Sequence, residues 1–319
     1  MSPHQAKPHI GISACLLGQE VRFNGGHKHS KYCTQQLAEH FQFEPVCPEV
    51  GIGLGIPREP IRLVGDITNP RAVKTHHPEE DVTAALVEFS QHKVQQLAHL
   101  SGYILMQKSP SCGMERVKVY ASNGYALPGG GVGVFAKALM KAYPLLPVEE
   151  EGRLHDPVIR ENFINRVFAY HEWQTTVVPH LSKQAIIQFH SRYKYLLMAH
   201  QQKEYRSLGR IVAQIAHKPL KQIADTYITA FMKILSVKAS RKNHCNVLQH
   251  ILGFLKKNAS AKTKQQILES IESYRSGILP LIVPVTLINH YVEQYGNDYI
   301  RLQTYLHPHP PSLGLRNQL

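Results

Sequence analysis

The spacing of apolar residues changes about halfway along this chain of 319 residues, and the change restricts the fold more than any other feature. Before Asp156, short apolar runs alternate with amphipathic stretches, which is typical of an α/β domain built on a mostly parallel sheet. After Asp156, apolar residues recur at the 3.6-residue spacing of packed helices and indicate an all-α domain. We therefore predict two domains, residues 1–175 and residues 176–319.

The same spacing predicts individual elements. Strands are predicted at His9–Leu16, Phe43–Cys47, Tyr103–Gln107 and Val117–Ala121. In the first domain, helices are predicted at Lys31–Phe41, from Pro78 to about His99, and from the Gly129–Gly133 segment to Tyr143. The second domain is predicted to consist of successive helices, one of them capped by Ser182, followed by an extended tail at His307–Leu319.

Positive charge is concentrated in the second part of the chain. Residues 1–150 carry 14 Lys+Arg and 13 Asp+Glu, whereas residues 151–319 carry 22 and 10. Within Lys183–Lys264, 16 basic residues accompany only Glu204 and Asp225. This excess indicates a polyanionic partner, most simply RNA, because Lys and Arg release the counterions condensed on phosphates. A solvated basic helical surface without a partner is the alternative.

Targeting signals and disulfide patterns are not evident in the sequence. No apolar run approaches the roughly 18–20 residues that cross a bilayer, and Met1–Pro8 has no apolar signal core. We expect a soluble, cytoplasmic protein with no membrane partner. The 5 scattered cysteines are too few for a disulfide framework in a chain this long, so we expect them to be reduced.

Three of the cysteines fall at the end of a predicted strand, where parallel sheets place their binding sites. Each lies beside proline or glycine: Cys15 in Ser13–Gly18, Cys47 in Val46–Arg58, and Cys112 in Lys108–Gly113. Three thiolates from three loops can hold a metal ion or an iron–sulfur cluster and leave one position open for substrate. The spacing alone supports buried packing cysteines equally well. We expect Cys33 and Cys245 to be packing residues.

The loop sequences, taken in order, resemble the signature segments of the thiouracil desulfidase family. These segments are the Cys15 loop with its following glycine, Cys47-Pro48-Glu49, Ser109-Pro110-Ser111-Cys112-Gly113 and the later Gly129–Ala136 stretch. The resemblance covers about residues 8–150. It implies a 4Fe–4S cluster held by Cys15, Cys47 and Cys112, with one iron that lacks a protein ligand. That iron would accept the soft sulfur of a thiolated pyrimidine and polarise the C–S bond for attack by water, without net redox.

This reaction needs a group that moves protons to and from the water and the departing sulfur. The family pattern supports Glu49, two residues after Cys47, and Ser109, three residues before Cys112. Each has a structural alternative, because Glu49 can pair with Arg58 and Ser109 can cap a turn.

Contacts to the pyrimidine substrate are less clearly indicated by the sequence. Arg22, Asn24 and Ser111 are the candidates. Asn24-Gly25 is equally typical of a tight turn.

The second half is similar to a helical domain that follows this module in longer homologues active on thiouridine in transfer RNA. Phe189–Tyr195 and Tyr205–Arg210 carry the similarity, and they provide Lys194, Arg206 and Arg210 as candidate RNA contacts.

The leading hypothesis is a 4Fe–4S-dependent, non-redox desulfidase that converts thiouridine in tRNA, position 4 preferred, to uridine. One alternative keeps the chemistry but acts on free thiouracil-type bases. Another is a non-enzymatic iron–sulfur protein that binds RNA or acts as a sensor, and it would need a fourth cluster ligand such as Cys33. No DNA partner is expected.

Overall fold

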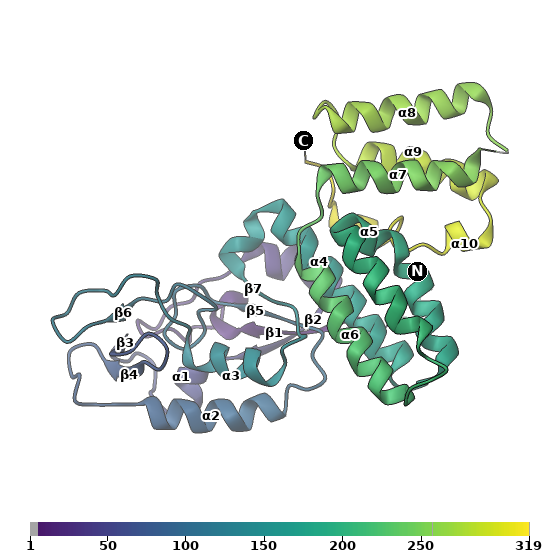
Figure 1. Cartoon of the computed structure of the whole chain (residues 1–319). Coiled ribbons are helices and arrows are strands. Elements are labelled where there is room, and N and C mark those ends of the chain that lie inside the picture. The colour runs from purple at the N-terminus through teal and green to yellow at the C-terminus, as the bar shows by residue number, and fades with distance from the viewer. Residues whose placement is uncertain (1–5, 257, 319) are drawn as a thin grey trace. The chain divides into compact units, whose positions relative to one another are not determined.

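The computed structural model describes residues 6–256 and 258–318, and the chain divides into two compact units, Met1–Asp156 and Pro157–Leu319 (Figure 1). This division lies before residue 175, because helix α4 (Pro157–Glu172) packs on α6 (Leu220–Ser236) of the second unit. It sharpens the separation of charge: residues 1–156 carry 15 Lys+Arg and 15 Asp+Glu, whereas residues 157–319 carry 21 and 8.

A four-stranded parallel sheet forms the centre of the first unit, which confirms the predicted fold class. Its strand order is β2 (Gln42–Val46), β1 (His9–Ser13), β5 (Gly102–Leu105) and β7 (Val148–Glu150). Ile10 and Ile12 are fully buried, as expected for an inner parallel strand. Because β1 lies between β2 and β5, the loops that follow these three parallel strands begin at neighbouring positions on the same edge of the sheet.

A second sheet contains one strand that was predicted, at Val117–Ala121, and two that were not. It contains β4 (Arg71–Lys74), β3 (Ile61–Val64) and β6 (Val119–Tyr120), with β3 antiparallel to β4 and parallel to β6. Two helices, α2 (Thr83–Gln95) and α3 (Val134–Ala142), pack against each other.

Several predicted elements differ from the structure. The strand predicted at His9–Leu16 ends at Ser13, and Ala14–Leu17 forms a 3₁₀ turn. The helix predicted from Pro78 begins only at Thr83, because Asp81 forms an isolated bridge with Val73 and accepts a hydrogen bond from the Thr83 backbone. Lys31–Phe41 forms a π-helical turn and a 3₁₀ turn instead of a regular α-helix. The tail contains a 3₁₀ turn at Pro311–Leu313, and Arg316 is buried.

The second unit is all-helical in the part that the structure describes, as predicted. After α4 and a π-helical turn at Trp173–Val177, its helices are α5 (Lys183–Ala213), α6, α7 (Arg241–Leu255), α8 (Ala261–Arg275), α9 (Ile282–Tyr295) and α10 (Asp298–Arg301). The Ser182 hydroxyl accepts a hydrogen bond from the Ala185 backbone, as the predicted cap requires. Helix α5 has a kink at Gln201, where the backbone dihedral angles are not helical.

Aromatic packing supplies much of the core of the second unit. The indole of Trp173 stacks on Tyr227, and the Phe189 ring lies between Trp173 and Tyr193, with centroid distances of 5.2 and 4.4 Å. Among the described residues, no helix combines the length and apolar character needed to cross a bilayer.

Candidate functional site

The three loop cysteines line one cavity of about 340 Å³ in the first unit. Cys15 lies in the 3₁₀ turn that directly follows β1, and Cys47 is the N-cap of the short helix α1 (Pro48–Gly51) that follows β2. Cys112 lies in the loop after β5. The order of the parallel strands therefore explains why residues far apart in sequence meet at one site. We call this space the cysteine cavity.

The loop that carries Cys112 is fixed from two sides. The Ser109 hydroxyl oxygen accepts hydrogen bonds from the backbone amides of Ser111 and Cys112, at 3.2 and 3.0 Å. The start of α3 approaches so closely that a Cβ on Gly133 would lie 2.6 Å from the carbonyl group of Ser111. The Phe135 amide also donates to the Ser111 carbonyl. The predicted glycine-rich helix start therefore holds the Cys112 loop in place.

The cysteine side chains are protonated thiols when nothing is bound to them. Burial and, to a smaller extent, the neighbouring Cys47 together raise the pKa of Cys15 to about 11. Burial also raises the pKa of Cys47 and of the still more enclosed Cys112. Because thiolates are the ligands of soft metals, binding of a metal group here must release protons.

The three thiols provide a donor set that suits a soft metal group. Among the described residues, no three His, Cys, Asp or Glu side chains converge closely enough to bind one ion. An iron–sulfur cluster spaces its ligands more widely, because each cysteine binds a different iron. Three soft thiol donors around one cavity fit such a group.

Glu49 also lines the cysteine cavity, and both of its carboxylate oxygens have protein partners. One oxygen, Oε2, accepts hydrogen bonds from Nη2 and Nε of Arg58 at 2.8 and 3.1 Å. The other, Oε1, accepts from the Ser111 hydroxyl at 2.9 Å. The salt bridge considered as an alternative is therefore present, and it holds the carboxylate at the cavity wall.

Arg58 also connects two of the cysteine loops. Its Nη2 donates to the carbonyl of Val21, beyond Cys15, at 2.9 Å, while its Nη1 donates to that of Gly55 at 3.1 Å. The side chain is only 5% exposed. The sequence indicates Arg58 only as a salt-bridge partner of Glu49, because its hydrogen bonds to distant carbonyl groups follow no sequence pattern.

The remaining candidates occupy different places. Arg22 and Ser109 line the cavity, whereas Ser111 is fully buried and contacts Glu49 without lining it. The Asn24 side chain accepts a hydrogen bond from the Gly26 amide at 3.2 Å and forms the tight turn that was the alternative. Lys108, a cavity residue with a positive φ of 59°, was not predicted, because a single loop lysine has no distinguishing sequence pattern.

The other two cysteines lie outside the cysteine cavity. Cys33 is fully buried in the π-helical turn, and Cys245 is buried in α7 of the second unit.

The three candidate RNA contacts all lie on α5. Lys194 precedes the kink, with Nζ 5.2 Å from the centre of the Tyr195 ring. Arg206 and Arg210 follow the kink, are exposed and are four residues apart, so they share one side of the helix.

The fold and this site define an α/β module with a thiol-lined cavity at the carboxyl edge of a parallel sheet. Residues 10–151 match the family model described as 2-thiouracil desulfurase, and residues 194–310 match a model described as a protein of unknown function (DUF1722). The chain belongs to the 2-thiouracil desulfurase family through its first unit.

Known relatives match about half of the chain. The uncharacterized protein YbgA of Escherichia coli K12 is 35% identical over 153 residues, which is 48% of this chain and 90% of YbgA. The uncharacterized protein YbbK of Bacillus subtilis 168 is 32% identical over 129 residues, covering 39% of this chain and 85% of YbbK. Among solved structures, the 4Fe–4S-dependent thiouracil desulfidase TudS is 30% identical, with a TM-score of 0.37, over 47% of this chain and 95% of that chain.

Proposed function

We propose that this protein is a 4Fe–4S-dependent, non-redox desulfidase that removes sulfur from thiouridine in tRNA, with 4-thiouridine as the preferred substrate. The observation that carries the proposal is the single cavity lined by Cys15, Cys47, Cys112 and the carboxylate of Glu49. Membership of the 2-thiouracil desulfurase family supports the reaction class. The charge of the second unit supports the choice of tRNA over a free base.

The three cavity cysteines would hold the cluster, as the sequence resemblance implies. When bound, the cluster supplies a soft, Lewis-acidic iron that can polarise a thiocarbonyl group. The protein side chains bind and orient the pyrimidine. Arg22 and Lys108 line the same cavity and offer N–H donors to the second ring carbonyl or a nearby phosphate.

Glu49 is the group of this chain that we expect to move protons. Arg58 fixes Oε2 with two hydrogen bonds, and this leaves Oε1, which carries only the Ser111 bond, as the oxygen able to take a proton from water. In this proposal the carboxylate then returns the proton to the ring nitrogen or the departing sulfur. Ser109 can orient water in the cavity with its hydroxyl hydrogen, since its oxygen serves the turn.

The second unit supports a polyanionic substrate because its positive charge is mostly unneutralised. Of the basic residues in Lys183–Lys264 that the structure describes, only Arg192 forms an ion pair, with Glu172 at 2.6 Å. Fixed cations without carboxylate partners are available to neutralise phosphates. We therefore propose that α5 contributes to binding the tRNA backbone through Lys194, Arg206 and Arg210.

Salt dependence should separate tRNA from free base as the substrate. If three phosphates are neutralised, kcat/KM on thiolated tRNA should fall about 30-fold as salt rises from about 50 to about 200 mM. Activity on free 4-thiouracil should change little over the same range, because no phosphate is bound.

A charge-matched pair of variants controls this measurement. Arg206→Gln with Arg210→Gln should weaken tRNA turnover and flatten its salt dependence, whereas Lys118→Gln with Lys141→Gln removes the same charge from exposed positions of the first unit. Equal salt dependence for tRNA and free base would favour a free-base desulfidase.

Ser111 offers a test of how the carboxylate is positioned. In Ser111→Ala the hydrogen bond to Oε1 is lost, and we expect kcat to fall about 10-fold while the iron content stays at the wild-type level. Ser109→Ala should instead loosen the Cys112 loop and reduce iron content. Steady-state kinetics and iron analysis of both variants check this, and unchanged kcat in Ser111→Ala would contradict the positioning role.

A further inference from the structure

Phe23 is the only aromatic residue among the described residues that line the cysteine cavity. It lies in the loop that follows Cys15, next to Arg22, which also lines the cavity. Phe23 is 38% exposed, whereas Ile61 and Cys112 in the same lining are 7% and 6% exposed. The buried members therefore form the inner part of the cavity, and Phe23 lies at its opening.

Hydrogen bonds fix the backbone on both sides of Phe23. Its carbonyl accepts from the Arg58 amide at 2.7 Å, and the Arg58 Nη2 donates to the Val21 carbonyl at 2.9 Å. The neighbouring Arg22 amide donates to the Gly26 carbonyl at 3.1 Å and closes the turn. Polar bonds of the loop therefore set the position of Phe23, and they hold an apolar ring where it is open to solvent.

Arg58 also connects this loop to the carboxylate of Glu49. The same Nη2 that donates to Val21 lies 2.8 Å from Glu49 Oε2, and Nε donates to that oxygen at 3.1 Å. One buried side chain thus fixes the aromatic loop and the group that we expect to move protons. A ring that rests on Phe23 is consequently held in a defined position relative to Glu49.

The Arg22 side chain adds a positive charge to this aromatic surface. Its guanidinium carbon lies over the Phe23 ring, 5.5 Å from the ring centre, which is within the range of cation–π contacts. An aromatic ring with an arginine beside it is the combination on which proteins stack nucleobases, because every base has a flat π-face and a phosphate nearby in the chain. The further apolar lining from Pro60 and Ile61 suits the same flat ring.

We propose that Phe23 stacks on the pyrimidine ring of the substrate and holds it against the wall that carries Glu49. The identity of the ring rests on the proposed function, and the inference applies equally to thiouridine in tRNA and to a free base. In tRNA, Phe23 would replace the neighbouring base from which the nucleotide separates to reach the cavity. Phe23 is then a substrate-binding residue, and Arg58 positions both it and Glu49.

Two ligands that differ in ring planarity test this proposal. Uracil and 5,6-dihydrouracil carry the same N–H and C=O groups, but dihydrouracil lacks the ring double bond, so its ring is puckered and cannot stack flat. Ligand-observed NMR under anaerobic conditions measures the binding of each to the full-length, cluster-loaded protein. The wild type should bind uracil at least about 5-fold more tightly, which is the lower end of what stacking on an aromatic side chain contributes.

Variants of Phe23 should change this preference in a defined way. Phe23→Ala should weaken uracil binding at least about 5-fold and change dihydrouracil binding little, so that the preference disappears. Phe23→Tyr keeps an aromatic ring and should retain it. The matched control is Tyr125→Ala, which removes a 77% exposed aromatic ring of the first unit outside the cavity lining and should leave both affinities unchanged. Iron content should equal that of the wild type in all three variants.

Sulfide release from 4-thiouracil by the same variants separates this inference from the proposed function. In Phe23→Ala, kcat/KM should fall at least about 5-fold. A wild type that releases no sulfide, but whose preference for uracil is lost in Phe23→Ala, would remove the proposed function and leave the stacking site. Equal binding of the two ligands by the wild type, or a preference for uracil that persists in Phe23→Ala, would overturn the role of Phe23 even if sulfide release is normal.

Discussion

Replacement of Cys15, Cys47 or Cys112 by alanine is expected to abolish cluster binding, whereas Cys33→Ala should retain the iron and sulfide of the wild type. The first three residues line the cysteine cavity, and Cys33 does not. A cluster with three protein ligands has no substitute when one thiolate is lost, because the described residues around it offer no fourth cysteine. Iron, sulfide and visible absorbance after anaerobic reconstitution measure the effect.

Cys33 is a well-matched control for this experiment. It is fully buried, and burial raises its thiol pKa to about 11, as for Cys15. Both residues are therefore thiols that are buried away from water, and they differ in their position relative to the cysteine cavity. A folded Cys33→Ala protein without iron would mean that the cluster has four cysteine ligands. That outcome would rule out an iron open to substrate.

Glu49→Gln should reduce sulfur release by about 10²- to 10⁴-fold, the usual contribution of general acid–base catalysis. Glutamine keeps the shape of the side chain and can still accept from Arg58, but it cannot take up a proton from water. Alanine is less suitable, because it would leave the Arg58 guanidinium, 5% exposed, without its carboxylate. Single-turnover assays of sulfide release measure the loss.

The controls for Glu49→Gln address charge and stability. Glu88→Gln removes the same charge from an exposed position of α2 in the same unit and should leave activity unchanged. Iron content and the binding of thiolated tRNA should remain at wild-type levels in both variants. Wild-type turnover by Glu49→Gln would assign the proton transfers to another group.

The fold class and the convergence of the cysteines were accessible from the sequence because both depend on local patterns. Apolar runs mark the strands that precede Cys15, Cys47 and Cys112, and the edge rule for parallel sheets then brings their loops together. Two strands of the second sheet were missed because β3 and β4 have four residues each, too few for alternation to stand out. The late start of α2 was missed because a bridge from Asp81 to a distant residue replaced the first turn.

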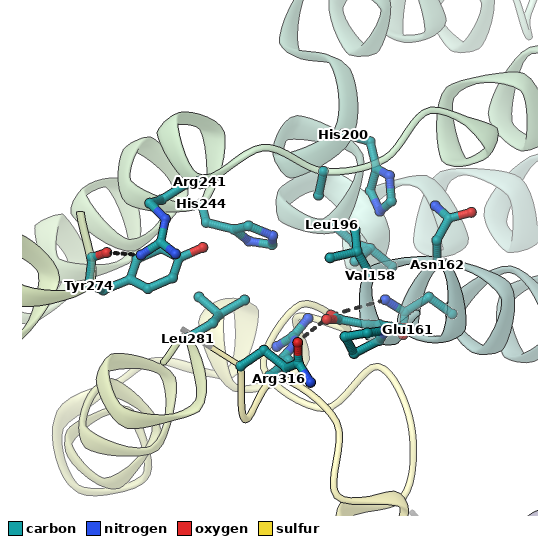
Figure 2. Close-up of a pocket in the computed structure, with 14 residues that line it drawn as sticks. Val158, Glu161, Asn162, Leu196, His200, Arg241, His244, Tyr274, Leu281 and Arg316 are labelled. Carbon is teal, nitrogen blue, oxygen red and sulfur yellow. Dashed lines mark hydrogen bonds and ion pairs between the residues drawn. The ribbon is translucent and has the colours of Figure 1, made fainter. Parts of the chain in front are cut away.

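Contacts between distant residues could not be derived in the same way. Ser111 meets Glu49 across 62 residues, and Arg316 meets Glu161 across 155 residues. Neither pair follows a helical or strand spacing, so only the packed structure brings them together. For the same reason the cavity of the second unit around Glu161 and Arg316, which joins α4 to the C-terminal segment, left no motif in the sequence (Figure 2).

The most direct test of the proposed function is nucleoside analysis of 4-thiouridine-containing tRNA after incubation with anaerobically reconstituted wild-type protein. We predict that 4-thiouridine disappears, that uridine increases by the same amount, and that hydrosulfide is released without an added electron donor or acceptor. Cluster-loaded protein that binds the tRNA and leaves its 4-thiouridine unchanged would contradict the proposal.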